Sequence, residues 1–155
     1  MYEIALESPN QIEVLKLFEM SDAYHASLYP AESNHLLNVT ELLNDNTHFF
    51  VARRVATQEV VGCAALVSYP DYGEVKRMFV LPETRGTGLG RELLMVLEMA
   101  AKQFGMRCIR LETGISQPEA IGLYRSAGFE EIGPFGLYEV DPLSLFMQKE
   151  LKAVS

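Results

Sequence analysis

Apolar side chains near the N-terminus recur at the spacing of a helix face. Ile12, Leu15 and Phe18 lie three residues apart, which places them on one side of a helix over about ten residues. The segment SPNQ at residues 8–11 can start this helix, because serine can cap, proline suits the first helical position and glutamine can reach back to the cap. We therefore predict a helix that opens with this segment and follows a short strand at residues 2–6.

Runs of β-branched and aromatic residues then predict three consecutive strands. A short helix at residues 34–43 precedes them and ends in a polar cluster of Asn and Asp. The segments HFFVARRV (48–55) and EVVGCAALVSY (59–69) are separated by three residues and are typical of a hairpin. GEVKRMFVL (73–81) forms the third strand. Its residues alternate between two sets, Val75, Arg77, Phe79 and Leu81 against Glu74, Lys76, Met78 and Val80.

The second half of the chain alternates helices with strands, and proline or glycine bounds most of them. The predicted elements are helices at 88–104 and 118–127 and strands at 107–113, 129–132 and 145–151. The chain has 155 residues and shows no repeat or linker, so we expect one domain over residues 1–155. A meander followed by strand–helix–strand–helix predicts a mixed α+β layered domain with one parallel crossover.

Composition excludes several classes of function. The formal net charge is −8, and an acidic surface repels nucleic-acid phosphates. No apolar run reaches the roughly 18 residues that span a bilayer, and the first ten residues lack the features of a signal peptide. We therefore expect a cytoplasmic protein without nucleic-acid or membrane partners.

The cysteine pattern excludes a disulfide framework or a zinc site. Cys63 and Cys108 each lie in an apolar, strand-like run with no partner nearby in the sequence. We expect both to be buried reduced thiols, and we expect no bound metal.

The clearest local motif is the glycine-rich turn RGTGLG at residues 85–90, between a strand and a helix. A helix start leaves about four backbone N–H groups without partners and carries a partial positive charge. Glycines let such a backbone approach a ligand, so the turn can cradle a pyrophosphate. Arg85 and Arg91, together with Arg125 in the later helix, indicate a local anionic ligand.

The turn admits three other interpretations. A dinucleotide fingerprint needs the spacing GxGxxG after a first strand, whereas this turn has GxGxG after a later one. A Walker A loop needs GxxxxGK followed by Ser or Thr, which is absent. A plain tight turn that begins a helix remains open on the hexapeptide alone.

Taken with its neighbours, the turn resembles the GCN5-related N-acetyltransferase (GNAT) superfamily, in particular small stand-alone bacterial members. The matching pieces, in order, are GEVKRMFVLP (73–82), RGTGLG (85–90) with its long helix, and AIGLYRSAGF (120–129). The second piece fits the pattern Q/R-x-x-G-x-G/A. The resemblance implies a central mixed, mostly antiparallel sheet of about six to seven strands flanked by about four helices.

The resemblance also implies acetyl-CoA as co-substrate. It would lie between the strand at 73–81 and the strand at 107–113, splayed near their ends. The residues that the family pattern places on it are Met78, Phe79, Val80, Arg85, Gly86, Thr87, Gly88, Leu89, Gly90, Arg91 and Gln117. The chain departs from the family pattern at one position: many members carry Asn where this chain has Gln117. The side-chain amide would therefore donate to the cofactor from a side chain that is one methylene group longer.

Glu74 is the expected general base, because it starts the central strand where such enzymes often carry a glutamate. It could take the proton of the amine directly or through water, if burial raises its pKa. The alternative is a strand-edge charge that pairs with Lys76 or Arg53.

Two further groups complete the implied chemistry. The backbone N–H of Met78 would stabilise the oxyanion. Tyr124 would protonate the leaving thiolate, since a phenol with a pKa near 10 stays protonated at pH 7. The alternative for Tyr124 is a core residue packed on Leu123 and Phe129.

The acceptor is expected to be a small-molecule amine. Candidate wall residues are Tyr29, Ser33, His35, Tyr72, Lys76, Phe135 and Tyr138. Lys76 could hold a carboxylate of an amino-acid-like acceptor, or be an exposed charge on the sheet. Protein acetylation and a catalytically inactive CoA-binding module remain alternatives. A homodimer is common among relatives, by analogy alone.

Overall fold

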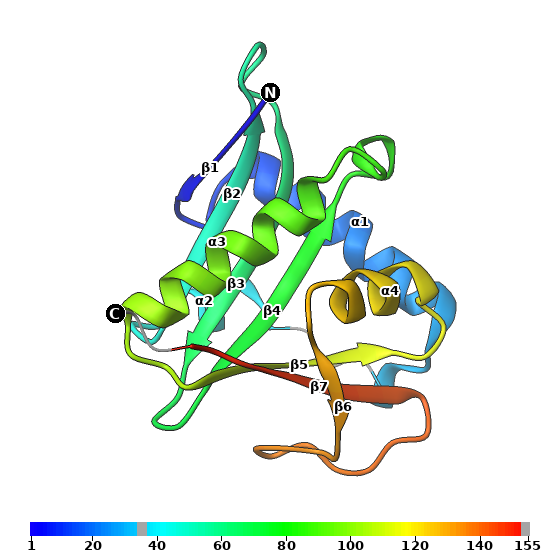
Figure 1. Ribbon diagram of the computed structural model, residues 1–155. Helices are drawn as coiled ribbons and strands as arrows, with labels where there is room; N and C mark the ends of the chain where they lie inside the picture. The colour runs from blue at the N-terminus through cyan, green and yellow to red at the C-terminus, as the bar shows by residue number, and fades with distance from the viewer. Residues whose placement is uncertain (34–36, 153–155) are drawn as a thin grey trace.

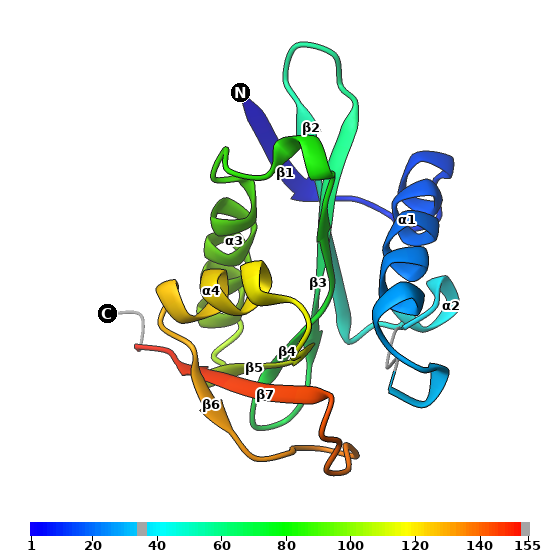
Figure 2. The same cartoon turned by 90° about the vertical axis from the view of Figure 1, so that its right-hand side faces the viewer.

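A seven-stranded sheet lies between two pairs of helices in the computed structural model, which describes residues 1–33 and 37–152. The strands are β1 (Tyr2–Leu6), β2 (Thr47–Arg54), β3 (Val60–Ser68), β4 (Gly73–Val80), β5 (Cys108–Gly114), β6 (Glu130–Ile132) and β7 (Ser144–Glu150). The helices are α1 (Ile12–Leu28), α2 (Val39–Leu42), α3 (Leu89–Gln103) and α4 (Pro118–Ser126). Figure 2 shows α1 and α2 on one face of the sheet and α3 and α4 on the other.

The sheet order is β1-β2-β3-β4-β5-β7-β6, and every neighbouring pair is antiparallel except β4 and β5. This confirms the mixed, mostly antiparallel sheet with one parallel crossover. The core is a continuous cluster that includes leucines of α3 and valines and alanines of β2 and β3, and α3 packs mainly on β3 and β4. Within the described ranges, no helix combines the length and apolar character needed to traverse a bilayer.

The first helix differs from its predicted start and length. It begins at Ile12 with Gln11 as its N-cap and runs for 17 residues. Gln11 donates to the carbonyl of Ser8 and to Glu7, so residues 8–11 form a turn before the helix. The helix is longer than predicted because Val14, Leu17, Phe18 and Ser21 continue its buried face.

The second helix is shorter than the predicted 34–43. It covers only Val39–Leu42, and Asn38 and Glu41 close a reciprocal capping box at its start. Part of the predicted segment, residues 34–36, lies outside the described residues. The capping residues set the boundary, because Asn38 competes for the backbone and stops the helix from extending toward the N-terminus.

β4 contains a bulge that breaks its predicted alternation. Cys63 pairs with Phe79 while Ala65 pairs with Lys76, so two residues of β4 face one residue of β3. Arg77 adopts a left-handed backbone there, with φ of 51°. Side chains on the two sides of the bulge therefore exchange faces, and the strict alternation predicted over residues 73–81 is wrong beyond Lys76.

The side chain of Arg77 anchors this bulge to α1 and its connection. Its guanidinium is 2.5 Å from Oδ1 of Asp22, donates to the carbonyl of Leu37 at 2.7 Å and stacks on Phe18. Only 6% of the side chain is exposed. Buried contacts on three sides hold a backbone conformation that costs free energy for any residue with a Cβ.

Replacing Arg77 tests this anchoring. We expect Arg77→Ala to lower the free energy of unfolding by about 2–3 kcal/mol, because it leaves the Leu37 carbonyl without its donor. Arg77→Gly loses the same contacts but relaxes the left-handed backbone, so it should cost roughly 0.5–1 kcal/mol less. Urea denaturation measures both, and a glycine variant less stable than the alanine variant would show that residue 77 stores no strain.

Candidate active site

β4 and β5 separate soon after they meet. Only Gly73 with Ile109 and Glu74 with Arg110 are paired, and the remaining residues of each strand have no partner on the other. The two strands diverge in Figure 1, with α4 beside the opening. This splay leaves the backbone edge of β4 open toward a groove and a central cavity.

The groove, of about 420 Å³, lies where the end of β4 meets the starts of α3 and α4. The residues that line it are Tyr24, His25, Met78, Phe79, Val80, Thr84, Arg85, Gly86, Gly88, Leu89, Gly90, Arg91, Gln117, Glu119, Ala120, Leu123 and Tyr124. Ten of the eleven residues predicted for the cofactor lie in this lining, and only Thr87 does not.

The glycine-rich turn is open where a ligand would contact it. Gly86 and Gly88 have φ of 81° and 90°, which favours glycine, and a Cβ added at either would meet nothing within 4 Å. Gly88 is the N-cap of α3 and no side chain caps the helix, so its first amides remain available. Gly90 has a different role, because a Cβ there would lie 2.9 Å from a methyl group of Leu123 in α4 and would require that side chain to move.

The polar side chains of the turn divide into two groups. Arg85 and Arg91 line the groove, and a guanidinium nitrogen of Arg91 donates to Ser126 of α4. Thr87 instead donates to the carbonyl of Thr84 and accepts from Tyr2, so its hydroxyl is turned to the protein. Arg125 does not line the groove, and the predicted cluster of three arginines is reduced to two.

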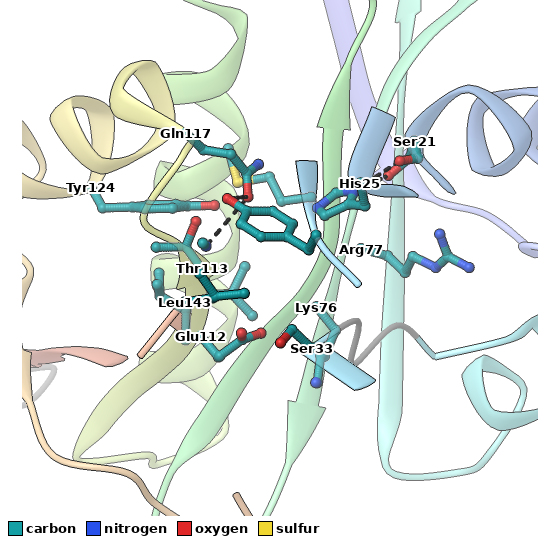
Figure 3. A pocket seen from close by; sticks show the side chains of 15 residues that line it. Ser21, His25, Ser33, Lys76, Arg77, Glu112, Thr113, Gln117, Tyr124 and Leu143 are labelled. Carbon is teal, nitrogen blue, oxygen red and sulfur yellow. Dashed lines mark hydrogen bonds between the residues drawn. The ribbon is translucent and has the colours of Figure 1, made fainter. Parts of the chain in front are cut away.

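The central cavity, of about 80 Å³, lies between β4 and β5 and joins the groove. Met78, Gln117, Tyr124 and His25 line both spaces. Figure 3 shows the hydroxyl of Tyr124 and the carboxylate of Glu112 directed into this cavity. A thioester carried along the groove would therefore end beside these groups.

Tyr124 is 8% exposed and packs on Phe129, so the predicted core contact is present together with access to the cavity. Burial raises the pKa of Tyr124 to about 12, and the nearby Glu112 carboxylate adds to the shift. The phenol is therefore protonated throughout the neutral range and can donate a proton.

Sequence reasoning missed several polar residues of the cavity, among them Ser21 and His25 of α1 and Glu112 of β5. His25 places Nδ1 2.7 Å from the carbonyl of Ser21; a carbonyl only accepts, so Nδ1 carries the proton. The sequence feature that could have revealed Ser21 and His25 is their spacing of four residues, which places two polar side chains on the same face of a helix. Glu112 accepts a hydrogen bond from the Ser144 hydroxyl at 2.7 Å. The feature that could have revealed it in the sequence is the polar side of the strand at 107–113.

Glu74 belongs to a buried polar cluster with Lys76 and Tyr138. The Tyr138 hydroxyl donates to Oε2 of Glu74 at 2.6 Å, and Nζ of Lys76 lies 3.2 Å from the same oxygen and bonds the Tyr138 oxygen. Burial and the Glu74 charge raise the pKa of Tyr138, which keeps it a donor. The Lys76 side chain is only 12% exposed, so the expectation of an exposed sheet charge is wrong. The pairing with Lys76 is present, whereas Arg53 pairs with Glu7.

A larger cleft of about 920 Å³ lies beside this cluster, between the β3–β4 turn and the segment that joins β6 to β7. Among the predicted wall residues, Tyr72, Lys76 and Tyr138 line it, while Tyr29 and Ser33 line the central cavity. Phe135 is buried behind Tyr72 and Tyr138 and contacts both rings. His35 lies outside the described residues.

Both cysteines are buried and free, as predicted. Burial raises the pKa of Cys63 to about 12, so its thiol is neutral and unsuited to nucleophilic attack. The Cys63 thiol donates to the carbonyl of Arg77 at the bulge. Among the described residues, no group of three or more His, Cys, Asp or Glu side chains is arranged to hold a metal ion.

Comparison with known proteins agrees with this geometry. The model of the acetyltransferase (GNAT) family matches residues 13–129. The IAA acetyltransferase of Azospirillum brasilense is 51% identical over 150 residues, which cover 96% of this chain and 97% of the relative.

Solved structures share the fold over nearly the whole chain. A Klebsiella pneumoniae protein provisionally named an acyl-CoA N-acyltransferase has a TM-score of 0.83 and 35% identity, covering 98% of this chain and 99% of its own. The PaiA N-acetyltransferase of Thermoplasma acidophilum, solved with coenzyme A, has a TM-score of 0.76 at 19% identity, covering 97% and 98%. The chain therefore belongs to the GNAT family and is an N-acetyltransferase that uses acetyl-CoA as its co-substrate.

Proposed function

We propose that this enzyme transfers the acetyl group of acetyl-CoA to an amine of a small, cationic metabolite by direct attack in a ternary complex. The observation that carries the proposal is that three neighbouring spaces share walls at the splay of β4 and β5: four residues line both the groove and the central cavity, and Lys76 lines both the cavity and the acidic cleft. A donor can enter from one end and an acceptor from the other, which brings the reacting atoms together without a covalent enzyme intermediate.

The cofactor takes the groove in this proposal. The first amides of α3, with Arg85 and Arg91, hold the pyrophosphate, because unpaired N–H groups and a helix N-terminus favour an anion. The open edge of β4 from Met78 to Val80 pairs with the amides of the pantetheine arm. The thioester then lies in the central cavity, which holds Tyr124.

Three groups of the protein act on the reacting atoms: the backbone N–H of Met78, the hydroxyl of Tyr124 and the carboxylate of Glu74. The amine nitrogen attacks the thioester carbon, and the Met78 N–H stabilises the negative charge that develops on the oxygen. The carbon–sulfur bond then breaks, and Tyr124 donates its proton to the departing thiolate. Its raised pKa of about 12 suits it to donate at neutral pH and to hold the proton between turnovers.

Glu74 accepts the proton of the attacking amine. It is 3% exposed, lies at the junction of the cleft with the splay, and already accepts from Tyr138. Lys76 lies at the same junction and lines both the central cavity and the cleft. A positive side chain at this point favours the neutral form of the amine, which is the form that attacks. Glu112, on the opposite strand, is the competing carboxylate.

The charge of the cleft supports a cationic acceptor. Its lining includes five carboxylates, Glu32, Glu41, Glu74, Glu139 and Asp141. Lys76 is the one basic side chain among the described lining residues, and it is engaged by Glu74. The stacked rings of Tyr69 and Tyr72 add an aromatic wall, which attracts ammonium groups. An amino-acid carboxylate at Lys76 is less favourable in this field.

Two variants with the same new side chain test the cofactor site. We expect Gly88→Glu to abolish measurable CoA binding, because it strains the left-handed turn and puts a carboxylate where the pyrophosphate lies. Gly122→Glu adds the same charge to an exposed position of α4 with open space around it, and should bind CoA as the wild type does. Titration calorimetry measures both, and tight binding by the Gly88 variant would reject this phosphate site.

The base is tested by a matched pair of amides. Glu74→Gln should lower kcat/KM by about 100-fold, because the amine loses its proton acceptor. Glu112→Gln should lower it by less than about tenfold, since that carboxylate faces the central cavity but does not line the acidic cleft from which the amine enters. Steady-state rates at saturating acetyl-CoA give both values, and the opposite order would assign the base to β5.

The acceptor class is tested by thiol release from acetyl-CoA across a panel of amines. We expect diamines and polyamines to exceed monoamines of the same length in kcat/KM by about tenfold or more, with an advantage that falls as salt rises. The panel also includes amino acids, aminoglycosides and a basic peptide. It includes IAA as well, because the Azospirillum relative is named an IAA acetyltransferase. A basic peptide that outperforms every small amine would favour protein acetylation, and no thiol release with any acceptor would favour an inactive CoA-binding module.

A further inference from the structure

Tyr29 connects the last turn of α1 to the loop that precedes α4. It follows α1 directly, and its backbone N–H donates to the carbonyl of His25. The side chain is 7% exposed and crosses the splay to reach the end of β5. A Cβ on Gly114 would lie 1.8 Å from the Tyr29 hydroxyl oxygen, so only glycine at that position admits the ring.

The hydroxyl of Tyr29 is held by two groups of this loop. It accepts a hydrogen bond from the backbone N–H of Ser116 at 3.1 Å and donates to Oε1 of Gln117 at 3.2 Å. Burial raises the pKa of Tyr29, so the hydroxyl keeps the proton that it donates. These bonds join residues 87 and 88 positions apart in the chain.

The orientation of the Gln117 amide follows from its partners. The backbone N–H of Gly114, which can only donate, also points at Oε1 at 3.3 Å. The atom facing Gly114 and Tyr29 must therefore be the oxygen, and Nε2 faces the other way (Figure 3). Gln117 is the N-cap of α4 but does not cap it with its side chain, and it lines both the groove and the cavity.

We propose that Tyr29 is a positioning residue for the cofactor: it fixes the amide of Gln117 so that Nε2 is presented to the pantetheine arm of CoA. The inference rests on CoA occupying the groove and is independent of the acceptor. It assigns to Tyr29 a role other than contact with the acceptor.

The length of glutamine explains why such a residue is needed. Gln has one more rotatable bond than Asn, so holding its amide in one orientation costs more side-chain entropy when CoA binds. The bonds from Tyr29 and Gly114 impose that orientation before CoA arrives. Preorganisation of this kind increases affinity without adding a contact to the ligand.

A double-mutant cycle on CoA affinity tests the proposal. Tyr29→Phe keeps the ring and removes the hydroxyl, and should weaken CoA binding by about five- to tenfold in titration calorimetry. Gln117→Ala should weaken it by about tenfold or more. Because Tyr29 acts through Gln117, adding Tyr29→Phe to Gln117→Ala should change the affinity by less than about twofold.

The control removes another hydroxyl from α1. Ser27 bonds only the carbonyl of Tyr24 among the described residues, and Ser27→Ala should bind CoA as the wild type does. Thermal unfolding of each free variant checks that it is folded. Equal losses from Tyr29→Phe with and without Gln117 would overturn the proposal in favour of a merely structural tyrosine, as would an unchanged affinity. A wild type that fails to bind CoA would instead remove the cofactor assignment.

A measurement on the wild type alone keeps the proposal testable if Tyr29→Phe does not fold. In the free protein, the two side-chain amide protons of Gln117 should give NMR signals displaced from those of a freely rotating glutamine side chain, and both should shift when CoA is added. Signals at the positions of a freely rotating glutamine, or signals that CoA leaves unmoved, would overturn it.

Discussion

The whole site depends on one interruption of backbone pairing, the separation of β4 from β5 after two residue pairs. Backbone N–H and C=O groups in a protein interior require partners, so a sheet that opens internally is costly unless a ligand or solvent completes it. Here the opening faces the groove of the glycine turn. The bulge at Arg77, held by the contacts of its buried guanidinium with α1, sets the path of β4 at this point.

Charge is distributed unevenly over the groove, the central cavity and the cleft. At the groove, free helix amides and two arginines create a positive end within a chain of net charge −8. At the cleft, five carboxylates create a negative end. The cavity between them holds tyrosines whose pKa values burial raises, so neutral donors separate the two fields. This separation of charge suits the proposed reaction, in which an anionic donor and a cationic acceptor approach one reaction centre from opposite sides.

The two helical layers contribute different parts of the site. α3 and α4 supply the groove, and Leu123 of α4 packs closely over Gly90 of α3. α1, on the opposite face of the sheet, reaches through the splay with His25 and Tyr29. In the role proposed for Tyr29, cofactor binding depends on the position of a helix that packs against the far side, because Tyr29 bonds the same loop that carries Gln117.

The sequence by itself determined the strands, the glycine turn, α3 and α4, because these depend on local periodicity and on proline and glycine at their ends. It also indicated the family and most of the groove lining, since the predicted cofactor residues except Gln117 lie in one short stretch around the turn. Only the tertiary structure decided the bulge at Arg77, the cluster of Glu74 with Tyr138, the entry of Glu112 into the cavity and the bond from Tyr29 to Gln117. These join residues far apart in the chain, and no local pattern records which side chains a folded sheet brings within hydrogen-bond distance.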